Sequence, residues 1–162
     1  MAGPQREVSM KLVIGADGAG KPLLDIIAKH LAAKGFDVTD LSPPSGSTPE
    51  FYAETAERVG LSITNHEFER GILFCGTGIG VCISANKVPG IRAALTHDTY
   101  SAERAAKSNN AQIITLGARV VGPELAKAVV DTWLASEFDD KGSSAGNVAA
   151  IDKLDGKYSA LV

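Results

Sequence analysis

The sequence predicts an α/β sandwich, in which helices cover both faces of a parallel sheet of five strands. Short apolar segments rich in β-branched residues alternate along the chain with longer segments of helical periodicity. Each apolar segment is too short to form an amphipathic helix. With 162 residues and 44% hydrophobic content, the chain has the size and composition of one globular domain. We therefore expect a single domain over residues 10–162, preceded by an N-terminal extension over residues 1–9.

The pattern of the segments sets the expected order of strands and helices. Strands are expected at residues 11–15, 37–41, 71–75, 91–95 and 113–116. Helices are expected at residues 22–34, 51–65, 79–87, 99–108 and 123–137. Pro22 and Pro123 suit the first turn of a helix, and Gly35 and Gly90 can adopt the left-handed conformation that ends one. Residues 42–48 are rich in Pro, Ser and Gly and are expected to form a surface loop.

The C-terminal segment carries one more helical pattern. Residues 138–146 are polar and contain glycine, and residues 147–158 are expected to form a helix. Alanine, isoleucine and leucine form an apolar face on that helix. We expect this face to dock on a partner subunit.

Charge and cysteine content disfavour several classes of protein. A net charge of −3 and a pI near 5.6 provide no basic field to attract nucleic acid or an anionic membrane surface. No apolar run approaches the roughly 20 residues needed to span a bilayer, and residues 1–9 lack the apolar centre of a signal peptide. The two cysteines, Cys75 and Cys82, do not have the pattern of a disulfide framework or a zinc cluster. The expected compartment is a reducing cytoplasm.

The segments that follow the strands are the first places to look for a site, because ligands bind outside the carboxyl ends of an open parallel sheet. The most informative of these segments is Cys75-Gly76-Thr77-Gly78-Ile79-Gly80. Its three glycines let the main chain approach a ligand closely, and they open a helix whose free amides point at that ligand. A cysteine in this place lies at the positive end of the helix dipole, which favours its thiolate form.

The glycine loop alone leaves two interpretations of Cys75 open. As a thiolate, Cys75 suits removal of a proton from a carbon beside a carbonyl, while the loop amides stabilise the resulting enediolate. Thr77 would then hydrogen-bond the same oxygens, and Asp17 would hold a hydroxyl or carry a proton. As a small apolar residue, Cys75 would instead pack at the end of a strand, a common place for a free cysteine. Cys82 is expected in the core.

Two glycine-rich segments come close to nucleotide-binding motifs. Residues 15–21 match the first seven positions of a P-loop, but Pro22 stands where a Ser or Thr must bind Mg²⁺. Residues 76–80 have the spacing Gly-x-Gly-x-Gly rather than Gly-x-Gly-x-x-Gly, and they follow the third strand rather than the first. Both departures disfavour a nucleotide-dependent enzyme.

His97 follows the fourth strand, at the edge where ligands bind. It would supply a polar contact or a proton to the ligand. Alternatively, it is simply exposed beside Asp98, which suits the N-cap of the next helix.

Four motifs taken together are far more specific than the glycine loop. They are GILFCGTGIG at 71–80, SANKVPGIRA at 84–93, YSA at 100–102 and GARVVG at 117–122. On these motifs the chain resembles the family of ribose-5-phosphate isomerase B and galactose-6-phosphate isomerase over residues 11–158. The resemblance implies a Rossmann-like three-layer sandwich and a small phosphorylated sugar as substrate. It also implies a homodimer or homotetramer with sites at the subunit interface, and no metal or organic cofactor.

The resemblance assigns roles to individual residues. It implies that Cys75 is the base, that Thr77 holds the enediolate, and that Asp17 contacts substrate hydroxyls. Arg119 is expected at the phosphate. The other substrate-binding residues that it implies are Gly76, Gly78, Ile79, Gly80 and Asn109.

The sequence departs from the family at three places that bear on specificity. Gly18 stands where the first loop of the family usually has a histidine, and Ser108 stands where the family has the histidine credited with opening the sugar ring. Near the C-terminus the family often has two phosphate-binding arginines, whereas the matching stretch here offers only Lys141. Phosphate binding is then expected to depend on Arg119, aided by Lys141 or Lys21.

The missing ring-opening histidine points to a four-carbon substrate. A pentose 5-phosphate closes a furanose ring through its 4-hydroxyl, whereas a tetrose 4-phosphate cannot, because that oxygen is esterified. We expect interconversion of D-erythrulose 4-phosphate and D-erythrose 4-phosphate, with D-ribulose 5-phosphate and D-ribose 5-phosphate as the competing pair. The alternative is a module that binds a phosphosugar or a nucleotide without turnover.

Overall fold

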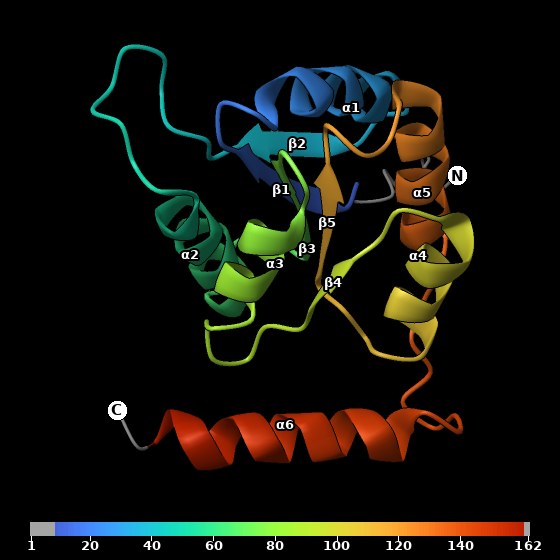
Figure 1. Cartoon of the computed structure of the whole chain (residues 1–162). Helices are drawn as coiled ribbons and strands as arrows, with labels where there is room; N and C mark the ends of the chain where they lie inside the picture. The colour runs from blue at the N-terminus through green and yellow to red at the C-terminus, as the bar shows by residue number, and fades with distance from the viewer. Residues whose placement is uncertain (1–8, 161–162) are drawn as a thin grey trace, which may run out of the picture.

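The computed structural model describes residues 9–160, and a five-stranded parallel sheet forms its centre (Figure 1). The strands lie in the order β2-β1-β3-β5-β4, and every neighbouring pair is parallel. The strands are β1 (Lys11–Ala16), β2 (Asp37–Asp40), β3 (Arg70–Cys75), β4 (Ala93–Leu95) and β5 (Ile113–Gly117). The helices are α1 (Lys21–Ala33), α2 (Tyr52–Thr64), α3 (Ile79–Ala85), α4 (Thr99–Lys107), α5 (Pro123–Leu134) and α6 (Ala145–Ser159). The predicted α/β sandwich with five parallel strands is confirmed.

The strands send alternate side chains into two separate helical layers. Ile14 and Phe74 are buried in the layer formed by α1, α4 and α5, whose largest buried side chain is Trp133. Val13 and Leu73 are buried in the layer formed by α2 and α3. Because both faces of the sheet are covered, its central strands β1, β3 and β5 are apolar and buried along most of their length, as the sequence pattern requires.

β4 is shorter than the sequence pattern predicts, since it begins at Ala93 rather than at residue 91. The side-chain amide of Asn86 bonds the main-chain N and O of Ala93 at 2.8 and 2.9 Å and so takes the place of a neighbouring strand. The main-chain N–H of Arg92 donates to the side chain of Gln112 instead of entering a ladder. Asn86 is also the C-cap of α3, which ends at Ala85 rather than at residue 87.

The end of α5 also differs from the prediction. The helix ends at Leu134 rather than at residue 137. The guanidinium of Arg70 donates to the carbonyl oxygens of Trp133 and Ser136, both at 2.8 Å. These carbonyl groups at the end of the helix are therefore satisfied by a side chain from β3.

α6 lies apart from the two helical layers and runs along one edge of the molecule (Figure 1). Asp152 forms an ion pair with Arg92 at 2.7 Å, and Asp155 accepts a hydrogen bond from the N–H of Gly90. The helix begins at Ala145, two residues before the predicted start. Its larger apolar side chains remain exposed, namely Ile151, Leu154 and Tyr158. Docking of this face on a partner stays a prediction.

Residues 1–8 of the predicted N-terminal extension lie outside the described residues, so the domain boundary stays a prediction. In residues 9–160, none of the helices combines the length and the apolar character that a membrane crossing requires.

The strand order creates a topological switch between β1 and β3, because the chain leaves these two strands toward opposite edges of the sheet. The crevice at the carboxyl ends of such strands is where ligands bind in open α/β sheets. Here the loops after β1 and β3 pack tightly together. A Cβ on Gly20 would lie 2.4 Å from the carbonyl atoms of Phe74 and 2.8 Å from the main-chain nitrogen of Cys75.

Candidate active site

The loop after β5 completes the crevice that the loops after β1 and β3 begin. The N–H of Ala118 donates to the carbonyl oxygen of Cys75 at 2.9 Å, and the N–H of Arg119 donates to that of Gly76 at 3.0 Å. These two bonds fix the position of residues 118 and 119 relative to the glycine loop. The predicted site residues Cys75 and Arg119 are therefore brought together although they lie on different strands.

Cys75 ends β3, and the residue is only 5% exposed. The main-chain N–H of Gly78 donates to Cys75 Sγ at 3.0 Å. A donor aimed at the sulfur stabilises a negative charge there. Burial is common to both interpretations of Cys75, because the side chain also packs in the cluster under α2 and α3. The hydrogen bond to the sulfur favours the interpretation as a base.

Gly78 can aim its amide at the sulfur only because it is glycine. Its φ is 77°, in the left-handed region that other residues rarely adopt. A Cβ at this position would also lie 2.7 Å from Leu95 Cδ1 and 2.8 Å from the carbonyl carbon of Leu116. The conformation of the loop and the contact to sulfur therefore depend on the same residue.

Thr77 and Ile79 are the exposed residues of the loop. Oγ1 of Thr77 accepts a hydrogen bond from the N–H of Ile79 at 3.2 Å, so its hydroxyl hydrogen can be donated to a ligand oxygen. Gly80 lies in the first turn of α3, where main-chain N–H groups have no acceptor within the helix. These donors suit a negatively charged oxygen.

Two residues that the sequence motifs do not single out support the glycine loop. Tyr52, in the first turn of α2, lies against Gly80, where a Cβ would be only 2.6 to 2.9 Å from the tyrosine ring and hydroxyl. Thr115 is buried in β5 and donates its hydroxyl to the carbonyl oxygen of Gly78 at 2.7 Å. The sequence does carry a signal for Thr115, which is a polar residue inside an apolar strand. No signal distinguishes Tyr52 from other residues at the start of a helix.

The loop after β1 holds Asp17 and leaves space beside it. Oδ1 of Asp17 accepts a hydrogen bond from the N–H of Gly20 at 2.9 Å, which stabilises this loop. Gly18 is exposed, and nothing lies within 4 Å of the position that a Cβ would take. Together with Lys21 and parts of residues 42–50, this loop lines a cavity of about 330 Å³.

The two cations expected nearest the site differ in how they are held. Nη1 of Arg119 would lie 3.1 Å from a Cβ at Gly76, so the guanidinium rests on the glycine loop. Nζ of Lys21 instead pairs with Asp25 at 2.5 Å and with Asp40 at 3.3 Å. The hydrogen bond to Asp25 is the main cause that raises the pKa of Lys21. Arg119 is therefore the better placed of the two to bind phosphate.

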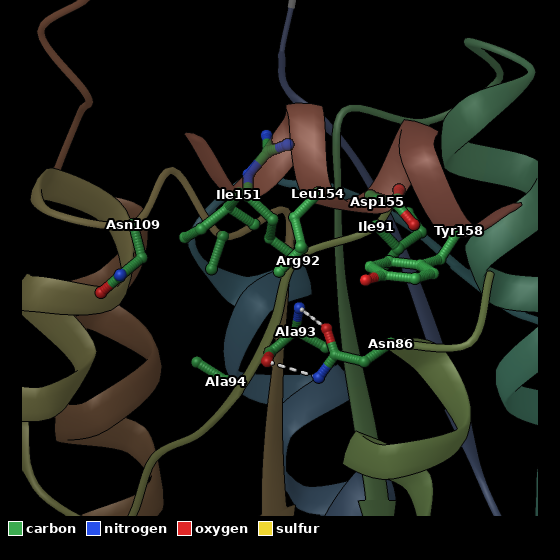
Figure 2. A pocket seen from close by; sticks show the side chains of 11 residues that line it. Asn86, Ile91, Arg92, Ala93, Ala94, Asn109, Ile151, Leu154, Asp155 and Tyr158 are labelled. Atoms are coloured by element: carbon green, nitrogen blue, oxygen red, sulfur yellow. Dashed lines mark hydrogen bonds between the residues drawn. The ribbon is translucent and has the colours of Figure 1, made fainter. Parts of the chain in front are cut away.

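Within one chain, Asn109 and Lys141 lie away from the glycine loop. Asn109 lines a groove of about 570 Å³ between β4 and α6, and no residue of the glycine loop lines that groove. Figure 2 shows Asn109 at one side of the groove and the α6 residues Ile151, Leu154 and Tyr158 along it. Lys141 lies in the turn before α6, where its N–H donates to Asp139 Oδ1 at 2.9 Å.

His97 contacts the main chain of the neighbouring strand. Its Nε2 accepts a hydrogen bond from the N–H of Gly117 at 2.9 Å. Burial lowers the pKa of His97, and the nearby Asp98 opposes this shift. The capping role predicted for Asp98 is confirmed, since its Oδ1 accepts from the N–H of Ser101 at 2.7 Å. His97 is only partly exposed, so the simple picture of an exposed histidine is wrong.

Cys82 departs from its predicted place in the core. It lies on α3 with intermediate exposure, and its thiol donates to the carbonyl oxygen of Ala93 at 3.6 Å. Partial burial raises the pKa of the Cys82 thiol. The two cysteines therefore differ in place, since Cys75 lies in the glycine loop and accepts the N–H of Gly78 at 3.0 Å, whereas Cys82 lies on α3 with its thiol toward β4.

The residues gathered at the crevice have complementary chemistry. Cys75 offers a sulfur that can take a proton, Thr77 and the main-chain amides offer donors, and Arg119 offers a positive charge. Among residues 9–160, no three His, Cys, Asp or Glu side chains are grouped so as to hold a metal ion. The arrangement suits proton transfer beside the carbonyl of an anionic substrate.

Comparison with known proteins agrees with this chemistry. The family model for ribose/galactose isomerases matches residues 12–151. A D-erythrulose-4-phosphate isomerase from Pectobacterium atrosepticum is 54% identical over 136 residues, which cover 83% of this chain and 89% of the relative. A ribose-5-P isomerase B from Listeria innocua is 46% identical and covers 91% of this chain and 99% of its own length. The solved structure of Clostridium thermocellum ribose-5-phosphate isomerase B superposes with a TM-score of 0.86 at 42% identity, over 92% of this chain and 99% of that chain.

Proposed function

Since this chain belongs to the ribose/galactose isomerase family and is an aldose–ketose isomerase of phosphorylated sugars, we propose that it interconverts D-erythrulose 4-phosphate and D-erythrose 4-phosphate. Cys75 acts as the base in this proposal. The observation that carries it is the N–H of Gly78 donating to Cys75 Sγ at 3.0 Å, which prepares the sulfur to hold a negative charge.

In the proposed mechanism one proton moves between neighbouring carbons. The Cys75 thiolate removes a proton from the carbon that bears the hydroxyl beside the carbonyl, and an enediolate forms. The thiol then returns the proton to the former carbonyl carbon, which yields the other isomer. A second proton passes between the two oxygens, and Thr77 or Asp17 carries it. The amide of Gly80 and the hydroxyl of Thr77 stabilise the negative charge that develops on these oxygens.

A four-carbon substrate is supported by the altered position Ser108. Ser108 is the C-cap of α4, and its hydroxyl interacts with Arg104 at 3.5 Å. A serine cannot replace a histidine as a proton donor for ring opening near neutral pH. An open-chain tetrose 4-phosphate does not need that step. The relative from Pectobacterium atrosepticum, with the name D-erythrulose-4-phosphate isomerase, supports the same choice.

We also propose that two subunits share each site. Arg119 binds the phosphate from the subunit that supplies Cys75, and Asn109 and Lys141 come from the other subunit. The separation of Asn109 from the glycine loop within one chain supports this arrangement. So do the exposed apolar residues of α6. The free thiol of Cys75 fits a reducing cytoplasm.

The decisive test of the substrate compares kcat/KM for D-erythrose 4-phosphate and D-ribose 5-phosphate with the purified protein, because only the five-carbon aldose closes a furanose ring. We expect the four-carbon substrate to be preferred by about tenfold or more, which corresponds to roughly 1.4 kcal/mol of transition-state stabilisation. If kcat/KM for the five-carbon substrate equals or exceeds that for the four-carbon substrate, the proposed chain length is wrong. The assignment as an isomerase of phosphorylated sugars still holds in that case.

The role of the base is tested with Cys75→Ala, and Cys82→Ala serves as the matched control. We expect kcat of Cys75→Ala to fall by about a thousandfold, the order of a general-base contribution, with binding of the sugar phosphate largely kept. Cys82→Ala is expected to stay within about threefold of the unmodified protein, because Cys82 lies on α3 outside the glycine loop and its thiol donates to a carbonyl oxygen on β4. Turnover in Cys75→Ala equal to the control would remove Cys75 from the mechanism. Binding without any turnover in the unmodified protein would favour the alternative, a module that binds a phosphosugar or a nucleotide without turnover.

A further inference from the structure

The last connection between β4 and β5 is made by a side chain. The ladder between the two strands ends at the pair of Leu95 and Thr115. Beyond it, the N–H of Thr96 still donates to the carbonyl oxygen of Thr115 at 3.0 Å. The N–H of Gly117 follows on β5, and it donates to Nε2 of His97 at 2.9 Å. The imidazole therefore satisfies a partly buried amide at the point where the sheet gives way to the site.

Gly117 is packed directly against the glycine loop. The position of a Cβ on Gly117 would be 2.5 to 2.7 Å from main-chain atoms of Thr77, and the nitrogen of Gly117 lies 3.0 Å from the position of a Cβ on Gly78. The residues that follow Gly117 donate their N–H groups to the carbonyl oxygens of Cys75 and Gly76. A change at Gly117 is therefore transmitted to the loop that carries Cys75.

We propose that His97 is a positioning residue for the isomerase: its neutral imidazole holds Gly117, and with it residues 118 and 119, against the glycine loop, so that protonation of His97 lowers turnover. This inference rests on the proposed function of the glycine loop. It gives His97 a role through Gly117 rather than a contact with the substrate.

The hydrogen bond requires one protonation state of the imidazole. Because Nε2 accepts from Gly117, a neutral His97 carries its proton on Nδ1. An imidazolium has hydrogen on both nitrogens, so it cannot accept, and its N–H would face the N–H of Gly117. Protonation therefore replaces an attraction by a repulsion at the edge of the site.

Several ionisable groups lie on the segments that meet at His97. They are Asp98 on its own turn, Tyr100 in the first turn of α4, Cys82 on α3, and Cys75 and Arg119 on the two loops. The carboxylate of Asp98 raises the pKa of His97, but burial has the larger, opposite effect. The net shift is downward, so the hydrogen bond is intact at neutral pH and breaks as the pH falls through the lowered pKa of His97.

The kinetic test compares the unmodified protein with His97→Gln and His97→Leu between about pH 5 and pH 9. Glutamine places an oxygen acceptor near the position of Nε2 and does not titrate, whereas leucine has similar bulk and no acceptor. We expect kcat of His97→Leu to fall by about tenfold near neutral pH with a smaller change in KM, and kcat of His97→Gln to stay within about threefold. We also expect the unmodified protein to lose kcat at acid pH more steeply than His97→Gln.

A second histidine provides a matched control. His66 follows α2 with a φ of 61°, which asparagine tolerates, so His66→Asn removes a histidine without strain. This variant should lose kcat at acid pH as steeply as the unmodified protein does. The proposal is overturned if kcat of His97→Leu stays within about twofold of the unmodified protein. It is also overturned if His97→Gln loses kcat at acid pH as steeply as His66→Asn does.

An NMR titration of the substrate-free protein tests the contact independently of turnover. We expect the amide signal of Gly117 to shift with the protonation of His97, and we expect this pH-dependent shift to be absent in His97→Gln. If the shift occurs while no sugar phosphate is isomerised, the proposed function fails and the contact stands. If sugar phosphates are isomerised but the Gly117 signal does not respond to pH, the role of His97 is overturned.

Discussion

Gly78 donates its main-chain N–H to Cys75 Sγ at 3.0 Å, and this bond spans the tightest part of the glycine loop. The bond depends on a positive φ of 77° at Gly78. The carbonyl oxygen of the same residue accepts from the buried hydroxyl of Thr115 at 2.7 Å. Gly78 is therefore held on both sides of its Cα, and the donor to the sulfur is fixed before any substrate arrives. Such preorganisation lets the site stabilise charge without rearranging during the reaction.

Gly78→Ala should reduce both stability and activity. The new Cβ would meet Leu95 and Leu116 at less than 3 Å, and alanine disfavours the positive φ. We expect a loss of about 1–3 kcal/mol in the free energy of unfolding, measured by urea denaturation, and a fall in kcat of about tenfold or more. Gly156→Ala is the control, because nothing lies within 4 Å of a Cβ there and the residue is inside α6. A Gly78→Ala variant as active as this control would show that the loop does not need its present conformation.

Arg119→Ala should weaken binding of the sugar phosphate more than it slows the chemical step. The guanidinium rests on the glycine loop at Gly76, beside the proposed enediolate site. We expect KM to rise by about tenfold, as for loss of a charged hydrogen bond, with a smaller effect on kcat. Lys21→Ala tests the alternative cation, and because Lys21 is paired with Asp25 and Asp40, we expect KM to change by less than about threefold. A larger effect of Lys21→Ala than of Arg119→Ala would exchange the two assignments.

The sequence pattern predicts the sheet correctly because buried parallel strands must be apolar. The limits of β4 are less accurate, since Asn86 bonds Ala93 through its side chain and no local pattern announces such a contact. The C-terminal limit of α5 is missed for the same reason, because Arg70, far away in sequence, satisfies the helix end.

The sequence predicts those site residues that directly follow strands. It does not predict contacts in which one partner contributes only a main-chain group. Cys75 and Arg119 are found from their position after strands and from the family motifs. The contact from His97 to Gly117 is not, because the two residues are 20 positions apart and one of them contributes only an amide. Tyr52 is missed because only the fold places it on Gly80.

Asp131→Asn should make stability less dependent on acid pH. Burial of Asp131 raises the pKa of its carboxyl group, but hydrogen bonds from Lys34 at 2.7 Å and from His30 at 2.8 Å outweigh burial and lower the pKa below its ordinary value. A lowered pKa in the folded state means that the carboxylate contributes stability above the unfolded pKa near 4, and that this contribution disappears as the pH falls through the folded pKa.

We therefore expect Asp131→Asn to lose about 1 kcal/mol of unfolding free energy at neutral pH, and the difference from the unmodified protein to shrink below about pH 4. Urea unfolding at a fixed protein concentration measures this. Asp25→Asn, which breaks a more exposed pair with Lys21, is the control and should have a smaller effect. A difference for Asp131→Asn that grows as the pH falls would contradict the assigned direction.

Gly18→His and Ser108→His together should move the preference toward a five-carbon sugar. Position 18 has open space for a side chain, since no atom lies within 4 Å of a Cβ there. A histidine at position 108 restores a group that can exchange a proton with the ring oxygen near neutral pH. We expect the ratio of kcat/KM for D-ribose 5-phosphate to that for D-erythrose 4-phosphate to rise by about tenfold in the double variant.

The two single variants separate the contributions of these positions. Ser108→His should raise turnover of D-ribose 5-phosphate, which enters as a closed furanose, more than turnover of D-ribulose 5-phosphate, which cannot close a furanose ring. Gly18→His should affect both five-carbon substrates alike, because it adds a polar contact and no ring-opening step. If Ser108→His improves the two substrates equally, ring opening does not limit the five-carbon reaction, and the substrate preference must come from the size of the site instead.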